Sequence, residues 1–511
     1  MLKKLPIGIQ TFSDLIEGEF LYIDKTKYIY DLIQPGKVRY FLSRPRRFGK
    51  SLLVSTFDAI FSGKKELFKG LWIYDNPEYD WQKYPIIKLD FGEINNKGAT
   101  NLTEDLKLRL LQIAKKNELI QDLAEKHQKQ VVVLIDEYDK PIIDHLGKDI
   151  ELAKENRDLL KSFYGVLKAQ DANLKFIFLT GVSKFSKVSV FSDLNNLNDI
   201  SLDEKYSGLL GYTEEELRLY FQEHLKICVK KQETQEEILL AKIKEYYNGY
   251  RFSKGEVRVY NPFSILLFFD KNEFDNYWFN SGTPTFLIDL LLEKDNSENL
   301  QNIENEKVDE NAFNSYELDS LAIFALLIQT GYLTIKEYHR ESRLYTLGYP
   351  NREVRESFLS YFLERSAKIT QGLGRTKIDK LKIILIKKDP DFEDFFIILR
   401  SFFANVPYDI QITLERYYQS LFYSIFALLG YMIETEVRTN QGRIDTVIIT
   451  EANIYLFEFK LDSSKEAALA QIKEKKYYEK YQGTGKKIYL IGVNFSTTKR
   501  NVDDYVVETI S

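Results

Sequence analysis

The sequence predicts an α/β protein that begins with a parallel β-sheet and ends with a second, smaller α/β domain. The first observation is that strand-like and helix-like runs alternate over the first ~200 residues, which is typical of a parallel sheet with helices on both faces. The second is a change of order after Leu414, where a helix is followed by three strands, another helix and a last strand. The stretch between these two regions is mostly helical, so we expect more than one hydrophobic core.

The N-terminal sheet is predicted from short runs rich in Val, Ile, Leu and Phe. Its strands are expected at Lys37–Leu42, Ile86–Phe91, Val131–Asp136 and Lys175–Thr180. The helices between and beside them are expected at Ser51–Phe61, Leu102–Ile120 and Lys154–Gln170. Because ligands of such sheets bind at the carboxyl ends of the strands, a site is expected just after them.

The middle of the chain is predicted to be mainly helical. Residues 211–290 have the pattern of a helical lid, and residues 291–312 are rich in Asn, Asp, Glu and Lys, which indicates a solvated linker. Helices are expected at Leu318–Gln329 and Asn351–Ser366, and between them one strand that opens with Gly331–Leu333 and a second at Arg343–Leu347. This order of helix, strand, strand and helix favours a winged-helix-like region, although a three-helix arrangement also fits.

The C-terminal domain is predicted to be a compact α/β unit. Its helices are expected at Leu414–Leu429 and Lys465–Tyr481, and its strands at Met432–Arg438, Ile444–Thr450, Ile454–Leu461 and Lys487–Asn494. At about 150 residues per domain, the length allows three or four domains. The expected divisions are residues 1–210, 211–290, 291–400 and 401–511.

Composition excludes several classes of protein. The net charge is only −5, so any surface for nucleic acid must be a local basic patch. The single cysteine, Cys228, rules out an internal disulfide, and with four histidines it makes an ordinary zinc cluster improbable. No apolar run reaches the ~18 residues that a membrane helix needs, and the N-terminus lacks a secretory pattern. We therefore expect a soluble cytoplasmic protein.

A phosphate-binding loop is predicted between the first strand and the helix after it. Such a loop turns backbone N–H groups towards the phosphates and adds a lysine for the β- and γ-phosphates and a hydroxyl for Mg²⁺. Gly49, Lys50 and Ser51 supply its last three positions, but Arg44 replaces its first glycine. The residues expected to contact ATP are Arg46, Arg47, Phe48, Gly49, Lys50, Ser51 and Leu52. The alternative is a solvated basic turn.

Two acids at the end of a buried strand support a P-loop NTPase. Asp136 would hold Mg²⁺ together with Ser51, and Glu137 would activate the attacking water. Thr180 ends the next predicted strand, where a sensor of the γ-phosphate would lie, although Ser183 and Lys184 are close rivals. The alternative is an ordinary strand end, but the order and spacing of loop and acids favour the nucleotide site.

A second acid cluster is predicted in the C-terminal domain. Glu458 and Lys460 are two residues apart on a strand, so both project from the same face. Asp445 opens the preceding strand and would lie beside Glu458 if the two strands pair. Two neighbouring carboxylates repel each other unless a cation lies between them, and Mg²⁺ prefers such oxygen ligands. Glu415, on the preceding helix, would complete the metal ligands, and Lys460 would stabilise negative charge in the transition state.

The helix that follows is predicted to approach nucleic acid. Gln471 and Tyr477 lie six residues apart, and both are expected at the edge of the site or at the phosphate backbone. The region is locally basic, as phosphate contact requires. Its lysines are Lys473, Lys475, Lys476, Lys480, Lys486 and Lys487. The alternative is a surface β-ribbon with scattered charges.

At these residues the chain resembles a prokaryotic family, the AAA-ATPase-like proteins with a C-terminal PD-(D/E)XK nuclease-superfamily domain. The resemblance covers nearly the whole length. It rests on the runs Pro6–Phe12, Tyr22–Thr26, Phe41–Ser51, Leu134–Asp139, Tyr246–Tyr250 and Tyr260–Phe263, and on the pattern Asp445, Glu458, Lys460, Gln471 and Tyr477. The loop containing Arg44 is similar to the family's own form of the phosphate loop, which answers the objection to the missing glycine.

The resemblance implies ATP with Mg²⁺ at the first site and a divalent metal, Mg²⁺ or Mn²⁺, at the second. It also implies a restriction-endonuclease-like C-terminal fold and DNA or RNA as the nuclease substrate, with DNA favoured. Our leading hypothesis is an ATP-regulated nuclease, and defence against mobile DNA is a guess at its role. Two alternatives stay open: an ATP-driven switch that binds nucleic acid without cleaving it, and a signalling scaffold that uses residues 313–366 to bind DNA or protein.

ATP turnover requires more than the residues named so far. An arginine that reaches the γ-phosphate is expected in many such modules. Arg251 and Arg258 are candidates, although a single arginine in a lid more often forms an ion pair. If the arginine comes from a second copy of the chain, the module is active only as a homo-oligomer.

Overall fold

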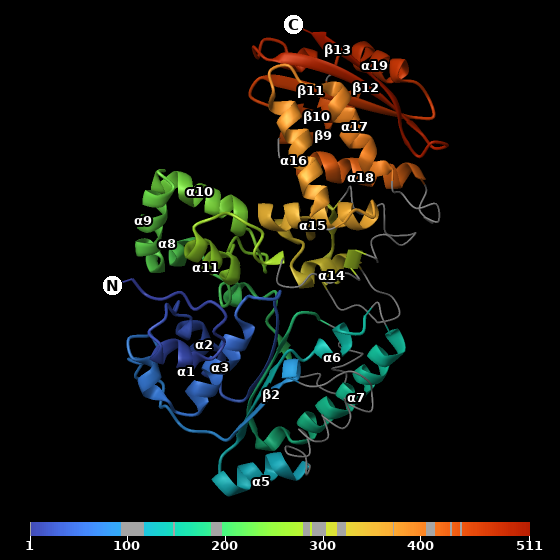
Figure 1. The fold of residues 1–511 in the computed structure, drawn as a ribbon. Helices are drawn as coiled ribbons and strands as arrows, with labels where there is room; N and C mark the ends of the chain where they lie inside the picture. Colours follow the sequence, from blue (N-terminus) through green and yellow to red (C-terminus); the bar gives the residue numbers. More distant parts are fainter. Residues whose placement is uncertain are drawn as a thin grey trace. The chain divides into compact units, whose positions relative to one another are not determined.

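A computed structural model describes residues 2–93, 117–146, 149–184, 197–279, 287–288, 303–313, 323–370, 372–404, 414–429, 432–439 and 442–510. For residues 117–119, 166, 414–420, 432–439 and 442–445 it describes the backbone alone. The chain divides into two compact units (Figure 1). The N-terminal unit comprises Met1–Leu287 and Ile303–Arg355, and the C-terminal unit Ile288–Asn302 and Glu356–Ser511. This boundary differs from the four predicted divisions, which stay a prediction.

The N-terminal unit is built on a five-stranded parallel sheet. Its strands are β1 (Val38–Ser43), β2 (Ile86–Asp90), β3 (Val131–Asp136), β4 (Leu174–Gly181) and β5 (Asn198–Asp199). Their order is β2-β3-β4-β1-β5, and every pair is parallel. Every residue of β3 is buried, which explains its unbroken apolar sequence. The prediction of a parallel α/β sheet is confirmed, and only the two-residue strand β5 was not predicted.

Helices cover both faces of this sheet. They are α1 (Phe12–Glu17), α2 (Thr26–Ile33), α3 (Lys50–Phe61), α5 (Asn117–His127), α6 (Lys140–Ile143) and α7 (Ile150–Ala169). In Figure 1, α1 to α3 lie on one side of the sheet and α6 and α7 on the other. The predicted helix Leu102–Ile120 falls mainly outside the described residues. Helix α3 begins at Lys50, so its N-terminus points at the carboxyl edge of the sheet.

Four further helices form the predicted lid region. They are α8 (Glu214–Tyr220), α9 (Gln222–Lys231), α10 (Glu236–Tyr247) and α11 (Pro262–Lys271). Local sequence fixes their starts: Thr213 and Glu216 form a capping box at α8, and Asn261 caps α11 in front of Pro262. The helices share one apolar cluster, in which Phe221 stacks on Phe269 at 4.9 Å between ring centroids.

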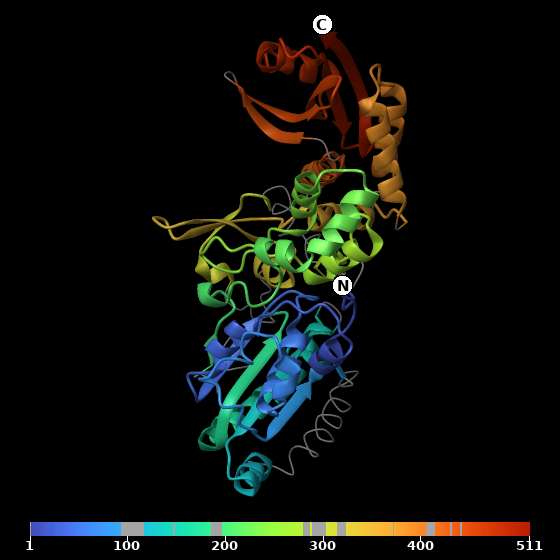
Figure 2. The same ribbon diagram turned by 90° about the vertical axis from the view of Figure 1, so that its left-hand side faces the viewer.

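The middle region has the predicted order of helix, strand, strand and helix. Helix α14 (Ile323–Thr330) precedes β7 (Thr334–His339), β8 (Leu344–Gly348) and α15 (Arg352–Ser366). A short strand, β6 (Lys307–Val308), completes an antiparallel sheet of order β6-β8-β7, which Figure 2 shows edge-on. Helix α15 begins in the N-terminal unit and continues into the C-terminal unit, because the boundary lies between Arg355 and Glu356.

The C-terminal unit is a mixed five-stranded sheet with helices. Its helices are α16 (Leu373–Ile386), α17 (Phe392–Phe403), α18 (Leu414–Leu428) and α19 (Lys465–Glu474). Its strands are β9 (Met432–Thr439), β10 (Gly442–Ile449), β11 (Asn453–Leu461), β12 (Lys487–Ser496) and β13 (Asn501–Ile510). The strand order is β13-β12-β11-β10-β9, and only β11 and β12 pair in parallel. The predicted element order is confirmed.

Two details of this unit differ from the prediction. Helix α19 ends at Glu474 and not at Tyr481, because Lys476 adopts a left-handed backbone conformation with φ of 50°. Strand β13 was not predicted, since its sequence, Asn501–Ile510, has two adjacent acids, Asp503 and Asp504, and lacks a clear apolar run. Within the described part of the chain, no helix is both long and apolar enough to cross a membrane.

Candidate functional site

The loop from β1 to α3 is shaped by two left-handed residues, Arg47 with φ of 65° and Gly49 with φ of 91°. Arg44 is not among the residues with positive φ, so its position does not require the missing glycine. Its guanidinium is buried, donates to the carbonyl oxygen of Ser201 at 2.7 Å and lies 4.2 Å above the ring of Phe252. The arginine side chain therefore anchors the start of the loop.

Lys50 is buried at the N-terminus of α3, with 7% of its surface exposed. Its Nζ donates to the carbonyl oxygens of Arg44 and Pro45, at 3.0 Å each. Burial lowers the pKa of Lys50, while the nearby carboxylates, Asp136 foremost, act in the opposite direction. An ammonium group held by loop carbonyls at a helix N-terminus fits a polyphosphate, because phosphate oxygens can replace those acceptors.

Two acids face this lysine from the end of β3. Burial raises the pKa of Asp136, while a hydrogen bond from Ser51 lowers it. Burial and the charge of Asp136 raise the pKa of Glu137, which is half-buried. Glu137 has a left-handed backbone with φ of 48°, a conformation that costs about 1 kcal/mol or more for a residue with a side chain. The Ser51 hydroxyl and the Asp136 carboxylate provide the oxygen ligands that suit Mg²⁺.

The end of β4 is organised by a buried acid that was not singled out as a site residue. Asp139 accepts hydrogen bonds from the backbone N–H of Val182 at 3.0 Å and from the N–H and hydroxyl of Ser183 at 2.6 Å each. Its Oδ1 lies 2.3 Å from where a Cβ on Gly181 would be, so only glycine fits there. The Thr180 hydroxyl is buried and donates to the Leu42 carbonyl at 2.8 Å, so in this structure it binds β1.

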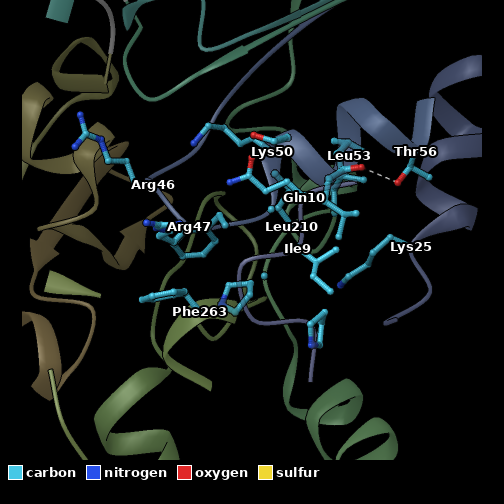
Figure 3. A pocket seen from close by; sticks show the side chains of 18 of the residues that line it. Ile9, Gln10, Lys25, Arg46, Arg47, Lys50, Leu53, Thr56, Leu210 and Phe263 are labelled. Carbon is cyan, nitrogen blue, oxygen red and sulfur yellow. Dashed lines mark hydrogen bonds between the residues drawn. The ribbon is translucent and has the colours of Figure 1, made fainter. Parts of the chain in front are cut away.

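One cavity of about 450 Å³ is lined by the phosphate loop and by the acids Glu137 and Asp139. The apolar side chains of Ile9, Leu210 and Phe263 also line it (Figure 3). The guanidinium of Arg47 stands 4.9 Å over the Phe263 ring. The cavity thus combines charged groups with apolar side chains, as a nucleotide requires.

The C-terminal unit holds a clamp of three side chains. Glu458 on β11 is buried, with 2% of its surface exposed, and its Oε1 lies 3.5 Å from the Nζ of Lys460. Gln471 on α19 bridges them: its Oε1 accepts from Lys460 at 2.5 Å, and its Nε2 donates to the same Glu458 oxygen. We call these three residues the β11–α19 clamp. Gln471 therefore contacts the acid and the lysine directly.

The backbone register brings the other predicted acid to this place. Thr446 of β10 pairs with Phe457 of β11 in an antiparallel ladder. Continued by one residue, that register sets the backbone of Asp445 opposite Glu458, as expected if the strands are neighbours. The side chains of Asp445 and Glu415 lie outside the described residues, so their roles as metal ligands stay predictions.

Comparisons with known protein families match the N-terminal and C-terminal parts of the chain to two different families. A family described as "Predicted AAA-ATPase" matches residues 6–117 and 111–191, and the PD-(D/E)XK nuclease superfamily matches residues 413–505. A relative from Azotobacter chroococcum mcd 1, described as an uncharacterized protein in the vnfD 5' region, is 39% identical over 541 residues. The match covers 99% of each chain. This chain belongs to the AAA-ATPase-like proteins with a C-terminal PD-(D/E)XK nuclease-superfamily domain.

Not all predicted contacts of this AAA-ATPase-like protein lie at a surface. Tyr477 is buried in the core beneath the C-terminal sheet, with 2% of its surface exposed, so its ring has no free face for a phosphate backbone. Several lysines of the predicted basic region form ion pairs. These pairs are Lys473 with Glu508, Lys476 with Glu479, and Lys487 with Asp389. Their charges are therefore partly neutralised within the unit.

The two candidate arginines of the AAA-ATPase-like unit are placed differently. Arg251 is buried, and its guanidinium donates to the carbonyl oxygens of Ser253, Lys254 and Lys336. Arg258 is exposed and donates to the Lys336 carbonyl at 3.3 Å. Neither lines the cavity, whereas Arg46 and Arg47 do.

Sequence reasoning missed the apolar side chains that line the cavity. Ile9 lies in the quoted run Pro6–Phe12, but nothing in that run alone indicates a ligand contact. Leu210 and Phe263 are ordinary apolar residues until the fold brings them together. Asp139 carried a signal, since it lies two residues after Glu137, the second of the two strand-end acids.

Proposed function

We propose that this protein binds and hydrolyses ATP in its N-terminal unit, that it cleaves nucleic acid in its C-terminal unit, and that ATP controls the cleavage. One observation carries the proposal. Each unit contains a lysine beside a buried carboxylate at the position that its family uses for chemistry: Lys50 facing Asp136, and Lys460 beside Glu458. Both substrates occur in the cytoplasm, where we expect the protein to act.

In the N-terminal unit, the loop and the helix N-terminus bind the phosphates. Backbone N–H groups at the start of α3 point at the polyphosphate, and the Lys50 ammonium exchanges its two loop carbonyls for phosphate oxygens. Ser51 and Asp136 are the residues that would hold Mg²⁺, which supplies charge neutralisation at the β- and γ-phosphates when bound. Glu137, whose pKa is raised by burial, is suited to accept a proton from the attacking water.

The apolar side chains of the cavity support a nucleotide rather than free phosphate as the ligand. Ile9, Leu210 and Phe263 form a surface of the kind that buries a planar base, and Arg47 stacks on Phe263 at its edge. An arginine for the γ-phosphate would come from Arg46 in the same loop or from a second copy, in which case the active form is a homo-oligomer.

In the C-terminal unit, Glu458 and Asp445 are the residues that would hold a divalent metal, Mg²⁺ or Mn²⁺. Carboxylate oxygens are the ligands these ions prefer, and such an ion supplies a polarised phosphate and a more acidic water when bound. Lys460 is kept beside this place by Gln471, where its charge stabilises a pentacovalent phosphate. DNA is the favoured substrate over RNA, and restriction of mobile DNA is the role we propose.

A cleavage assay tests the proposal directly. The full chain is incubated with Mg²⁺ or Mn²⁺ and with single- and double-stranded DNA and RNA, with and without ATP. We expect cleavage that disappears in Asp445→Ala and Glu458→Ala, and ATP binding that disappears in Lys50→Ala. Binding to nucleic acid without cleavage under every metal would instead favour the ATP-driven switch. Cleavage by both acid variants at the wild-type rate would exclude the nuclease assignment.

A further inference from the structure

A segment far from the phosphate loop in sequence is fastened to the loop's backbone. The indole Nε1 of Trp278 donates to the carbonyl oxygen of Arg46 at 3.1 Å. Gly331, in the turn between α14 and β7, packs against Pro45: a Cβ added to this glycine would lie 2.7 Å from the Pro45 ring. Trp278 and Tyr332 are in edge-to-face contact, with ring centroids 5.3 Å apart. Two consecutive loop residues, Pro45 and Arg46, thus contact Gly331 and Trp278.

The last turn of α14 also contacts the segment that follows β4. Gln329, the penultimate residue of α14, accepts a hydrogen bond from the backbone N–H of Lys184 at 2.8 Å. Lys184 directly follows Val182 and Ser183, the two residues whose N–H groups are held by Asp139. Gln329 is buried, with 8% of its surface exposed. Residues 329–331 therefore contact both segments that border the expected γ-phosphate.

Trp278 is connected in turn to the first turn of α15. Its backbone N–H donates to Oε1 of Glu353 at 2.5 Å, and the Ser264 hydroxyl of α11 donates to Oε2 at 2.7 Å. Glu353 is fully buried. A buried carboxylate is unfavourable unless its hydrogen bonds are kept, so this residue fixes α15 to the lid helix and to Trp278.

We propose that Trp278, Gln329 and Glu353 form a nucleotide relay, which transmits the state of the phosphate loop to α15 and through that helix into the C-terminal unit. Helix α15 runs without a break from Arg352 to Ser366 and so crosses the boundary between the units at Arg355. The relay rests on the proposed function, because it assumes that the cavity binds ATP. It adds the residues through which ATP controls the nuclease.

The change that starts the relay follows from the bonds of Lys50. Its Nζ is bound to the carbonyls of Arg44 and Pro45. When phosphate oxygens take over this ammonium, both carbonyls lose their donor and the loop backbone must find new partners. Pro45 packs on Gly331, and the next carbonyl, that of Arg46, is bound to Trp278, so a change in loop geometry acts on both contacts. Coupling between such sites typically amounts to about 5- to 150-fold in affinity.

The first experiment uses Trp278 as its own reporter. The chain has only three tryptophans, so Trp72→Phe with Trp81→Phe leaves Trp278 alone in the full-length protein. We expect ATP with Mg²⁺ to change the emission of Trp278, and the same titration of a Lys50→Ala version to give no change. Emission that stays constant while labelled ATP binds in a Lys50-dependent way would overturn the relay but not the ATP site.

The second experiment breaks the relay at Gln329. Gln329→Leu removes the acceptor for the Lys184 N–H, and Thr330→Val is the matched control, because the Thr330 hydroxyl donates within its own helix to Leu326. Hydrogen exchange of residues 352–366 is compared with and without a non-hydrolysable ATP analogue. We expect the nucleotide analogue to change the hydrogen-exchange rates of these residues in the wild type and in Thr330→Val. In Gln329→Leu the change should be at least threefold smaller.

Two outcomes separate the relay from the proposed function. Analogue affinity in Gln329→Leu should stay within about threefold of the wild type, and the ratio of cleavage rates with and without ATP should approach one. If neither the wild type nor any variant cleaves nucleic acid, the nuclease proposal fails. The hydrogen-exchange and fluorescence data would still show whether the relay operates. If Gln329→Leu and Trp278→Phe both keep the full nucleotide effect on α15, the relay is wrong even when cleavage is robust.

Discussion

The two candidate sites of this chain are assembled in opposite ways. The C-terminal clamp takes its residues from one strand and the next helix, Glu458, Lys460 and Gln471, all within a short stretch of sequence. The N-terminal cavity takes its residues from places as distant as Ile9 and Phe263. When a site is built from neighbouring elements, the spacing of its residues in the sequence is enough to predict it. When distant segments complete a site, the sequence predicts only the residues that are close together in the chain, which here are those of the phosphate loop.

Their lysines differ in the same way. Lys50 is held by two main-chain carbonyls of its own loop, whereas Lys460 is held by side chains of β11 and α19. Phosphate oxygens can replace the carbonyl partners of Lys50, with a change in the loop. The β11–α19 clamp needs no such change to present Lys460. We therefore expect the N-terminal site to respond structurally to its ligand and the C-terminal site to be preorganised.

Removing each lysine is the sharpest test of this comparison and has the largest expected effects. Lys460→Ala should lower the cleavage rate about 100-fold or more, the cost of losing one electrostatic group that stabilises a transition state. Lys50→Ala should abolish measurable ATP binding. Both activities are measured on both variants: cleavage in the absence of ATP, and ATP binding in the absence of nucleic acid. Each variant then serves as the control for the other. Loss of both activities in either variant would mean that the sites are not separate.

Gln471→Leu tests whether the clamp positions Lys460. The substitution keeps the approximate size of the side chain but removes both hydrogen bonds of the amide. Groups that orient a metal ligand or its neighbour typically contribute about 10- to 100-fold in activity or metal affinity, and we expect a loss of cleavage in this range. The measurement is the cleavage rate as a function of Mg²⁺ concentration. Glu474→Gln, on the exposed face of the same helix, should match the wild type, and equal rates for Gln471→Leu would remove the amide from the clamp.

Much of the fold and part of each site could be predicted from the sequence, for physical reasons that can be named. The strand β3 is buried on both faces, so all its residues before Asp136 are apolar. This apolar run predicts the strand, and the acid that follows it predicts where the strand ends. Gly49, Lys50 and Ser51 are adjacent because a single turn of backbone must surround the phosphates. Glu458 and Lys460 alternate along a strand, which fixes their common face without knowledge of the fold.

Other features depend on tertiary contacts that no local pattern records. Tyr477 has a residue type that occurs both in cores and at surfaces, and only packing against the sheet decides that it is buried. The Thr180 hydroxyl satisfies a carbonyl of β1 because β4 and β1 are neighbours, which the chain order does not state. Arg44 replaces a glycine because its side chain reaches Ser201, which is distant in sequence.

Asp139→Asn probes how the N-terminal site is held ready. Asp139 accepts from Val182 and from two groups of Ser183, all at Oδ2, and an uncharged amide oxygen accepts such bonds more weakly than a carboxylate does. The end of β4 should loosen, and we expect ATP hydrolysis to slow by about tenfold, the scale of a misplaced active-site group. ATP affinity should change less than threefold, because the phosphate loop is intact. Asp149→Asn, which caps a helix turn elsewhere, serves as the control, and a Kd change as large as the change in kcat would contradict a positioning role.

The last expected effect is on stability, and it too concerns the N-terminal unit. Burial raises the pKa of Glu353 to about 8, with Asp275 adding to the shift and the bonds from Trp278 and Ser264 opposing it. In the unfolded chain this carboxyl has its ordinary pKa near 4.5. Between these values the folded protein keeps a proton that the unfolded chain releases. The free energy of unfolding should therefore decrease as pH rises from about 5 to 8, by at most about 1.4 kcal/mol per pH unit.

Glu353→Gln removes this dependence, because an amide does not ionise yet can still accept from the Trp278 N–H and bond to Ser264. All three tryptophans lie in the N-terminal unit, so urea unfolding followed by tryptophan emission reports on that unit. The wild type and the exposed variant Glu341→Gln should lose stability between pH 6 and pH 8, and Glu353→Gln should lose clearly less. An identical slope in all three proteins would show that Glu353 is ionised throughout, and the bond to Trp278 would then be a charged contact at every pH tested.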